Sequence, residues 1–359
     1  MSALFGILGI DDTERVYANT LGQSVIYDAI NEVLNRFNDE VDKALSVFVE
    51  SVTEDHTQRY KLPGGGRLAK MSGRATSPEV KAYGGWDVAY PLEQWGASVG
   101  GSRVDLAYMT VQDLDRHIQT VMIKDLNTVR FELLRRLFNS GTRSFADELH
   151  GTLTIQPLAN GDGVLYPPIV GSESEATEDH YYHSGYTSAN ISDTNNPYKT
   201  IVDELEEHFG KPVGGSEIVT FINSAQTAKT VALTNFVEVQ DIHVRPGDDT
   251  AVPAGLPSRV PGKIIGRMTD GAWVSEWNFI PSDYILGLHL AAPAPLRMRV
   301  DPSYTGLPRG LALVADSDKY PIKESHWEHR FGFGTGNRLN GVFLEFNASA
   351  FSIPTGYTY

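Results

Sequence analysis

The sequence predicts an α+β protein that combines one very long helix with many antiparallel strands. Residues 24–50 and 111–139 carry apolar residues at three- and four-residue spacing, which indicates one face of a helix. From residue 216 onwards, short apolar stretches alternate with turn residues and do not follow the regular strand–helix order of a parallel sheet. Between the two helices, residues 57–101 are rich in Gly, Pro and single aromatic residues.

Composition narrows the class further. The chain has 359 residues, of which 41% are hydrophobic, enough for a substantial core, while 34 Gly and 19 Pro indicate many turns. The absence of cysteine excludes disulfides, thiol nucleophiles and cysteine-ligated metal sites. The N-terminus lacks the basic region of a secretory signal, and no run of about 18 apolar residues occurs. We therefore expect a soluble intracellular product that makes no use of a membrane.

The net charge of −15 is distributed unevenly along the chain. Residues 57–143 carry 13 basic and 8 acidic groups, whereas residues 1–56 carry 3 and 11 and residues 144–260 carry 5 and 17. An acidic chain with one basic segment is not typical of a nucleic-acid-binding protein. Complementary segments favour contacts between copies of the chain, and an ordinary solvated surface is the alternative.

The first helix is predicted over residues 24–50, with Ser24 as its N-cap. Because this segment is near the terminus and acidic, it could be a mobile arm rather than core. Its apolar stripe comprises Ile26, Ile30, Val33, Phe37, Val41, Leu45 and Phe48.

Residues 57–101 predict an extended two-stranded loop, because turn signals at 63–66 and 83–85 separate strand-like stretches. The loop has too few apolar residues to form its own core and must rest on something else. A neighbouring subunit is one support, and a disordered surface loop is the alternative. Five large rings argue against disorder: Tyr60, Tyr83, Trp86, Tyr90 and Trp95.

Residues 111–139 give the strongest helical pattern in the chain. Thr110 and Asp113 have the spacing of a capping box, and "NSG" at 139–141 supplies a stop. At 1.5 Å per residue this helix is about 43 Å long, so we expect it to act as a spine. A coiled coil is less favoured, because the stripe is short and has Lys124 and Asp125 on its flank. The stripe comprises Val111, Leu114, Ile118, Met122, Leu126, Val129, Leu133 and Leu137.

The rest of the chain predicts a small α/β region followed by strands. A helix is expected at 197–209, and a buried strand at 216–223 leads into a second helix at 224–236. The strands that follow are predicted in "GKIIGRM", "AWVSEWNFI", "YILGLHLAA", "LRMRVDP", "GLALVAD", "HWEHRFGFGTGN" and "GVFLEF".

The glycines of "HRFGFGTGN" invite a phosphate-binding interpretation, which the pattern does not support. A dinucleotide fingerprint needs a third glycine where Asn337 stands, and a helix where a strand follows. Gly332 and Gly334 instead share one face of a strand, and Phe331 and Phe333 share the other. The bare face predicts close approach to another backbone.

The sequence contains two histidine pairs that are candidates for a metal site. His180 and His183, with Glu178 and Asp179, could form a metal site. A second pair, at 326 and 329, is badly arranged, because strand residues three apart face opposite sides. No S-x-x-K motif occurs. Polar contacts at the surface or between subunits are the favoured explanation of the histidines, and we expect no catalytic residue, metal or cofactor.

The order of these parts resembles the major capsid protein of a tailed bacteriophage, a fold also found in encapsulin shells. The resemblance covers residues 55–346 and is carried by the order of the elements, by the loop beginning "RYKLPGGGRL", by "IVTFINSAQTAKTVAL" and by the closing "HRFGFGTGNRLNGVFLEF". It implies four regions: an N-terminal arm with an amphipathic helix at 1–56, an extended loop at 57–101, a peripheral domain at 102–150 and 301–359 with the spine helix 111–139 and long C-terminal strands, and an axial domain at 151–300.

The resemblance also implies a function. The chain would assemble with itself into hexamers and pentamers of an icosahedral shell that encloses phage double-stranded DNA without sequence-specific binding. Separate scaffolding and portal proteins are implied, a decoration protein is left open, and the location is the virion, assembled in the host cytoplasm. The alternatives are an encapsulin-type compartment and a metal-dependent enzyme that uses His180 and His183.

Contacts between subunits are expected where the basic segment and its aromatic residues lie. The residues chosen for this role are Tyr60, Lys61, Arg67, Lys70, Arg74, Tyr83, Trp86, Trp95, Arg135 and Arg136.

Overall fold

The computed structural model describes residues 4–9, 16–63, 68, 70–71, 85–100, 108–210, 217–239, 260–315, 324–347 and 349–359. Its helices are α1 (Leu4–Leu8), α2 (Ala18–Leu21), α3 (Gln23–Leu45), α5 (Val111–Phe138), α6 (Pro197–Phe209) and α7 (Ser224–Val231), with short 3-10 turns at Ser188–Asn190 and Ser303–Thr305. The first nine strands are β1 (Val49–Thr53), β2 (Thr57–Tyr60), β3 (Trp86–Ala89), β4 (Glu93–Gly100), β5 (Arg143–Asp147), β6 (Gly151–Ile155), β7 (Tyr181–His183), β8 (Ile218–Ile222) and β9 (Phe236–Glu238). The others are β10 (Lys263–Met268), β11 (Ala272–Glu276), β12 (Tyr284–His289), β13 (Leu296–Arg299), β14 (Ala312–Ala315), β15 (Glu324–Thr335) and β16 (Val342–Glu345). The predicted α+β class is confirmed.

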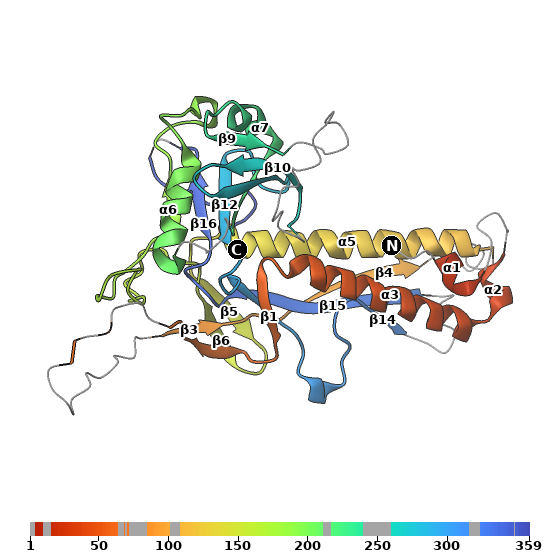
Figure 1. Ribbon diagram of the computed structural model, residues 1–359. Coiled ribbons are helices and arrows are strands. Elements are labelled where there is room, and N and C mark those ends of the chain that lie inside the picture. Colours follow the sequence, from red (N-terminus) through yellow and green to blue (C-terminus); the bar gives the residue numbers. More distant parts are fainter. Residues whose placement is uncertain are drawn as a thin grey trace.

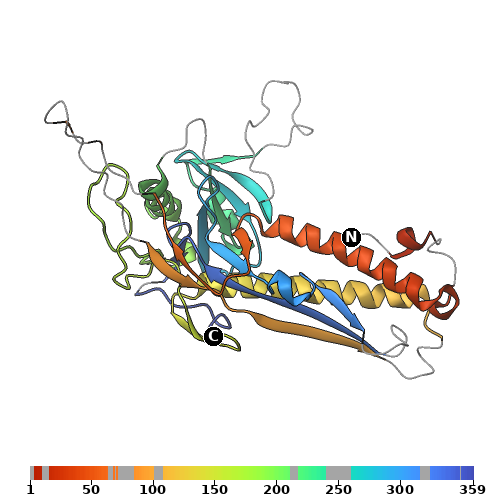
Figure 2. The same cartoon turned by 90° about the horizontal axis from the view of Figure 1, so that it is seen from below.

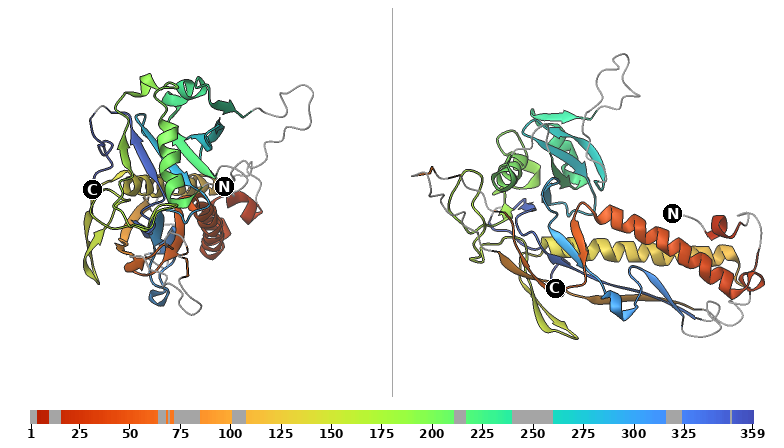
Figure 3. Two further views of the ribbon diagram at one scale, coloured as in Figure 1. Left: turned by 60° about the vertical axis from the view of Figure 1, so that its left-hand side comes forward. Right: turned by 60° about the horizontal axis from the view of Figure 1, so that its bottom comes forward.

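The molecule has an elongated part and a lobe at one end of it (Figure 1). In the elongated part α5 runs beside α3, with the long strands β4 and β15 along its length, as Figure 2 shows from below. The lobe contains β8 to β12, β16, α6 and α7, and the two views of Figure 3 show it standing off one end of α5. Strand β3 lies at the end of the molecule opposite to α1 and α2 (Figure 1).

The elongated part is built on a five-stranded sheet with β15 at its centre. The order is β1-β13-β15-β14, and β4 pairs with β15 as well. Strand β15 is long enough to pair with β4 and β14 along its first residues and with β13 along its last four. Residues 93–100, which the sequence analysis placed in the extended loop, therefore belong to this sheet.

The lobe is built on a seven-stranded sheet in the order β7-β16-β12-β8-β11-β10-β9. Strand β8 is buried along its whole length, as its continuous apolar sequence predicts. Helix α6 covers one face through Ile201, and a Cβ on Gly287 of β12 would lie 2.1 Å from the Ile201 side chain. The absence of a side chain at Gly287 therefore lets α6 pack directly on the sheet.

Helix α5 has the limits and the cap that the sequence predicts. The Thr110 hydroxyl accepts from the Asp113 N–H, and the Asp113 carboxylate accepts from the Thr110 N–H, which completes the capping box. The predicted helix over 197–209 is confirmed as α6, whereas the helix predicted over 224–236 ends as α7 at Val231. Within the described ranges, no helix is long and apolar enough to cross a lipid bilayer.

Helix α3 is part of the core of this chain. All seven residues of the predicted stripe are buried in one cluster with the apolar face of α5, namely Ile26, Ile30, Val33, Phe37, Val41 and Leu45 of the helix and Phe48 just beyond its end. The helix ends five residues earlier than predicted, because Val49–Thr53 forms β1 and pairs with β13. The expectation that this segment is a mobile arm is therefore wrong for α3, because its apolar stripe is buried in the same cluster as that of α5.

The glycine-rich segment forms the end of β15 and has the bare face that the sequence predicts. A Cβ on Gly332 would lie 2.2 Å from the Pro91 carbonyl oxygen, and one on Gly334 would lie 2.5 Å from that of Ala89. Phe331 and Phe333 lie on the other face, with ring centroids 5.5 Å apart. These glycines serve backbone approach, and the strand continues into a turn and β16 rather than a helix.

Candidate assembly surface

The base of the extended loop is fixed by a nest of aromatic rings. Strands β2 and β3 pair with each other, with Tyr60 opposite Trp86. The two rings stack at 5.5 Å, and Trp86 meets Tyr166 edge-on at 5.1 Å. The Trp86 indole N–H donates to the Gly336 carbonyl at 3.0 Å. Tyr60 and Trp86 are buried within this chain, so their rings hold the loop to its own subunit.

A polar network surrounds this nest. The Tyr60 hydroxyl donates to Glu50 at 3.1 Å, and the Arg297 Nε–H donates to the same carboxylate oxygen at 3.0 Å. Arg297 also donates to the Gln58 side-chain oxygen, and its guanidinium lies over the Tyr60 ring at 5.2 Å. Burial raises the pKa of Tyr90 to about 12, so this neighbouring phenol stays neutral. Nothing in the local sequence singled out Glu50 or Arg297, which come from β1 and β13.

Arg299 continues the network to the hairpin of β5 and β6. It donates to the Tyr90 carbonyl at 3.0 Å and to the Asp147 carboxylate at 2.6 Å. Burial opposes ionisation of Asp147, but hydrogen bonds from Arg299 and from two backbone N–H groups hold its pKa below the usual range. A buried, hydrogen-bonded ion pair of this kind costs stability when one partner is lost, so it fixes where the chain leaves β3.

The other residues expected at subunit contacts are spread over several environments. Lys61, directly after β2, and Lys70 are exposed, and Trp95 is half-buried beside Phe331, with ring centroids 6.2 Å apart. Three further expected contact residues lie outside the described residues: Arg67, Arg74 and Tyr83. Within the described part, the exposed lysines are the members of the predicted set that are open to a neighbour.

Arg135 and Arg136, at the end of α5, contact the C-terminal segment of the chain. Arg135 donates through Nε to the Thr358 carbonyl at 3.1 Å, and its guanidinium lies 4.2 Å from the Tyr359 ring. Arg136 is fully buried and donates to the Asn139 carbonyl at 3.0 Å. Both cations therefore stabilise the fold of this chain, which leaves little of Arg136 for a neighbour.

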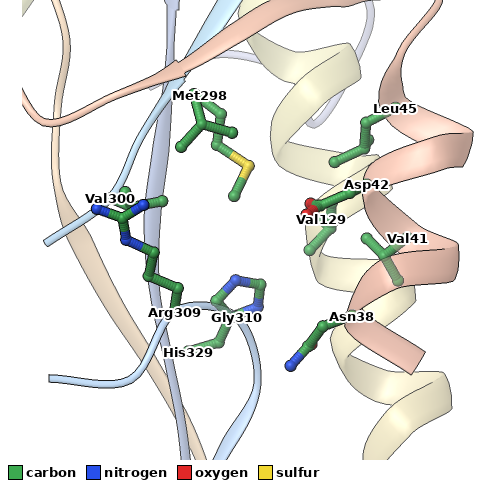
Figure 4. Close-up of a pocket in the computed structure, with 11 residues that line it drawn as sticks. Asn38, Val41, Asp42, Leu45, Val129, Met298, Val300, Arg309, Gly310 and His329 are labelled. Atoms are coloured by element: carbon green, nitrogen blue, oxygen red, sulfur yellow. The ribbon is translucent and has the colours of Figure 1, made fainter. Parts of the chain in front are cut away.

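A small cavity lies between α3, α5 and the five-stranded sheet (Figure 4). Its volume is about 140 Å³, and apolar side chains such as Val41, Val129 and Met298 form much of its wall. His329 lies at its edge, and its Nδ1 is 2.7 Å from an Asp125 carboxylate oxygen. His326 is only half-buried, whereas His329 is buried, as expected for strand residues that face opposite sides.

The histidine cluster differs from the one that the sequence analysis considered. His180 is fully buried, but His183 is exposed and does not join it. His180 instead meets Glu204 and His208 of α6. The spacing of Glu204 and His208, four residues apart on one helix face, is the sequence signal that could have pointed to this grouping.

No family model matches the chain, and no curated protein matches it. Among solved structures, a chain of one titled "Mycobacterium phage Patience" matches with a TM-score of 0.62 and 19% identity, covering 96% of this chain and 95% of that one. A chain of "Capsid structure of the Cyanophage P-SCSP1u" matches with a TM-score of 0.47 and 9% identity, covering 84% and 86%. A chain of "Capsid of native GTA particle computed with C5 symmetry" matches with a TM-score of 0.46 and 12% identity, covering 85% and 90%.

The first of these matches extends over nearly the whole of both chains. The fold that the sequence resembles, that of a tailed-phage major capsid protein, is the fold of this chain.

Proposed function

We propose that this chain is a self-assembling major capsid protein that forms the icosahedral shell around packaged phage DNA. The observation that carries the proposal is the likeness of fold over 96% of the chain to a chain of a phage structure. The elongated part and the anchored hairpin of β2 and β3 support it, because a long subunit with a projection offers a large perimeter to its neighbours.

The regions are assigned roles within the proposed subunit. The arm (1–56), the extended loop (57–101), the peripheral domain (102–150 and 301–359) and the axial domain (151–300) keep the roles that the resemblance implies. Three strands argue for adjusted boundaries: β4 and β13 belong to the sheet of the elongated part, and β16 belongs to the sheet of the lobe. We assign the loop to residues 57–90 and count α3 with the elongated body.

The proposed partners follow from the same assignment. The chain pairs with copies of itself as hexamers and pentamers, acts with separate scaffolding and portal proteins, and has no catalytic role. Its place is the virion, after assembly in the host cytoplasm. With a net charge of −15 the shell would repel the phosphates of the DNA rather than adhere to them, so we expect a neutral to acidic inner surface.

Negative-stain microscopy of the purified chain at high concentration tests this function. Closed shells or rings of five and six subunits are the expected result. A chain that stays monomeric, with a scaffolding protein from its own gene neighbourhood present as well as absent, would overturn the proposal. An encapsulin-type compartment would be identified instead by two findings. The shells would co-purify with one cargo protein, and the gene of this chain would lie beside the gene of that cargo rather than beside portal and terminase genes.

A further inference from the structure

A compact group of metal-ligating side chains lies where α6 meets the edge of the seven-stranded sheet. His180 directly precedes β7, while Glu204 and His208 lie one helical turn apart on α6. Strand β7 pairs with β16, and α6 lies beside β16 (Figure 1). The group therefore brings together helix α6 and the edge strand β7, whose described strand pairing is with β16.

The three ligand atoms form a small triangle. His180 Nε2 lies 3.2 Å from His208 Nε2 and 3.7 Å from Glu204 Oε1, and His208 Nε2 lies 3.8 Å from the same oxygen. The point in the plane of the three atoms that is equidistant from them lies about 2.1 Å from each, which is within the range of zinc bonds to an imidazole nitrogen or a carboxylate oxygen. The side chains are thus spaced as ligands of one small cation.

The hydrogen bond on the far side of His180 sets its tautomer. Its Nδ1 lies 2.9 Å from the Gly341 carbonyl oxygen, which can only accept, so Nδ1 carries the proton. Nε2 of the neutral ring then presents a lone pair toward His208 and Glu204. A backbone carbonyl that orients a ligand imidazole in this way is the usual outer partner of a metal-bound histidine.

One carboxylate oxygen of the group lacks a hydrogen-bond partner. Glu204 Oε1 is buried and has no hydrogen-bond donor, although the Tyr182 hydroxyl bonds to the Glu204 carboxylate. Glu178 and Glu207 add further carboxylates within ligand distance of Glu204 and His208.

We propose that His180, Glu204 and His208 bind one divalent transition-metal ion, Zn²⁺ by preference, which ties α6 to the β7 edge of the lobe. Two imidazole nitrogens and one carboxylate suit zinc and its first-row neighbours, whereas calcium and magnesium favour sites made of oxygen alone. A second group of possible ligands, formed by Glu178, Glu204, Glu207 and His208, adjoins this one but does not include His180. His180 and His208 side chains are 0% and 2% exposed, so the ion has a structural role.

The test uses untagged full-length protein, stripped with a chelator and then titrated with Zn²⁺ by calorimetry, and with Co²⁺ by absorption spectroscopy. We expect one zinc per chain, a visible d–d absorption typical of tetrahedral cobalt that zinc abolishes, and a rise in Tm on adding zinc. Calcium and magnesium at the same concentration should leave the Tm unchanged.

Matched variants separate this site from adventitious binding. His208→Gln and Glu204→Gln each remove one ligand, and each should weaken zinc binding by about 100-fold or more, because even the loss of an outer-shell partner costs 10–100-fold. His183→Gln removes a nearby but exposed histidine and should leave binding unchanged.

Two results would overturn the proposal. The first is a metal-free wild-type chain that circular dichroism shows to be folded, but that gives no cobalt absorption band and no heat of binding on titration with zinc. The second is zinc binding that His208→Gln and Glu204→Gln leave intact or that His183→Gln removes. Neither result depends on shell formation, so the failure of this proposal and that of the proposed function are distinguishable.

Discussion

From their positions in the sequence, both helix α3 and the hairpin of β2 and β3 could be expected to lie outside the main body, but their structures differ. Helix α3 buries a continuous apolar stripe against α5 in the largest core cluster. The described base of the hairpin is held by Trp86, which stacks on Tyr60 and meets Tyr166 edge-on.

The difference shows what makes a segment depend on a neighbour. A repeated apolar stripe finds a matching surface within its own chain, because burial of about 25 cal/mol per Å² accumulates along its length. A stretch of Gly, Pro and separate aromatic residues can be anchored where one aromatic residue is buried, but it has no continuous apolar face with which to form a core of its own. The hairpin, rather than α3, is therefore the segment expected to serve assembly.

The largest effect is expected from truncating the stripe of α3. Phe37→Ala removes a buried ring, 5% exposed, and should lower the free energy of unfolding by about 3–5 kcal/mol. Val25→Ala, on the exposed side of the same helix, should change it by less than about 0.5 kcal/mol. Denaturant unfolding of both variants measures this, and equal small effects would mean that α3 is a detachable arm.

The next effect concerns the backbone that the loop base rests on. A Cβ at Gly334 would lie 2.5 Å from both the Ala89 carbonyl oxygen and the Tyr90 ring, so Gly334→Ala should cost about 1–3 kcal/mol. Gly334→Val should be worse and should impair shells. At Gly336 the nearest atom would be 3.3 Å away, so Gly336→Ala is the milder control.

The measurement is thermal unfolding of the two alanine variants together with microscopy. If Gly334→Ala is as stable as the wild type, β15 can move away from the chain that leaves the hairpin, and the base is less fixed than its hydrogen bonds indicate.

The smallest effect belongs to the cap of α5, the helix on which α3 packs. Hydrogen bonds from the Thr110 hydroxyl and backbone N–H hold the pKa of Asp113 below its usual range. The stabilisation is therefore complete above the unfolded pKa of about 4 and is lost as the pH falls through the lower folded pKa. Because the side chain is 47% exposed, Asp113→Asn should cost only about 0.5–1 kcal/mol at pH 7.

Unfolding free energies of the wild type and Asp113→Asn between pH 7 and about pH 2 test this cap, with Asp28→Asn on the exposed face of α3 as the charge-matched control. The gap between wild type and Asp113→Asn should close at low pH. A gap that persists there would assign the effect to packing rather than to the ionised carboxylate.

Local features of this fold could be predicted from the sequence. The limits of α5 follow from its stripe and its capping box, and the bare face of β15 follows from the alternation of Gly332 and Gly334 with phenylalanines. The pairing of β2 with β3 follows from turn signals between two strand-like stretches. Each of these depends on residues within one element or two adjacent ones.

Long-range partners could not be predicted in the same way. The pairing of β4 with β15 joins residues more than 220 apart, and neither strand carries a mark of its partner. Arg297 and Glu50 meet at the loop base from two different strands, and His180 meets His208 rather than the nearby His183. Such partners are determined by the packing of elements that are distant in the sequence, and the sequence around each residue does not indicate them.

The central claim is that the body folds alone and that the loop serves assembly. A variant in which residues 63–83 are replaced by Asn-Gly keeps the paired base of β2 and β3 and closes it with a tight turn. Sedimentation velocity of this variant beside the wild type tests the claim most directly. We expect the wild type to form shells, and the variant to sediment as a smaller species that still unfolds cooperatively at the wild-type Tm. Shells of normal size from the variant would contradict the claim.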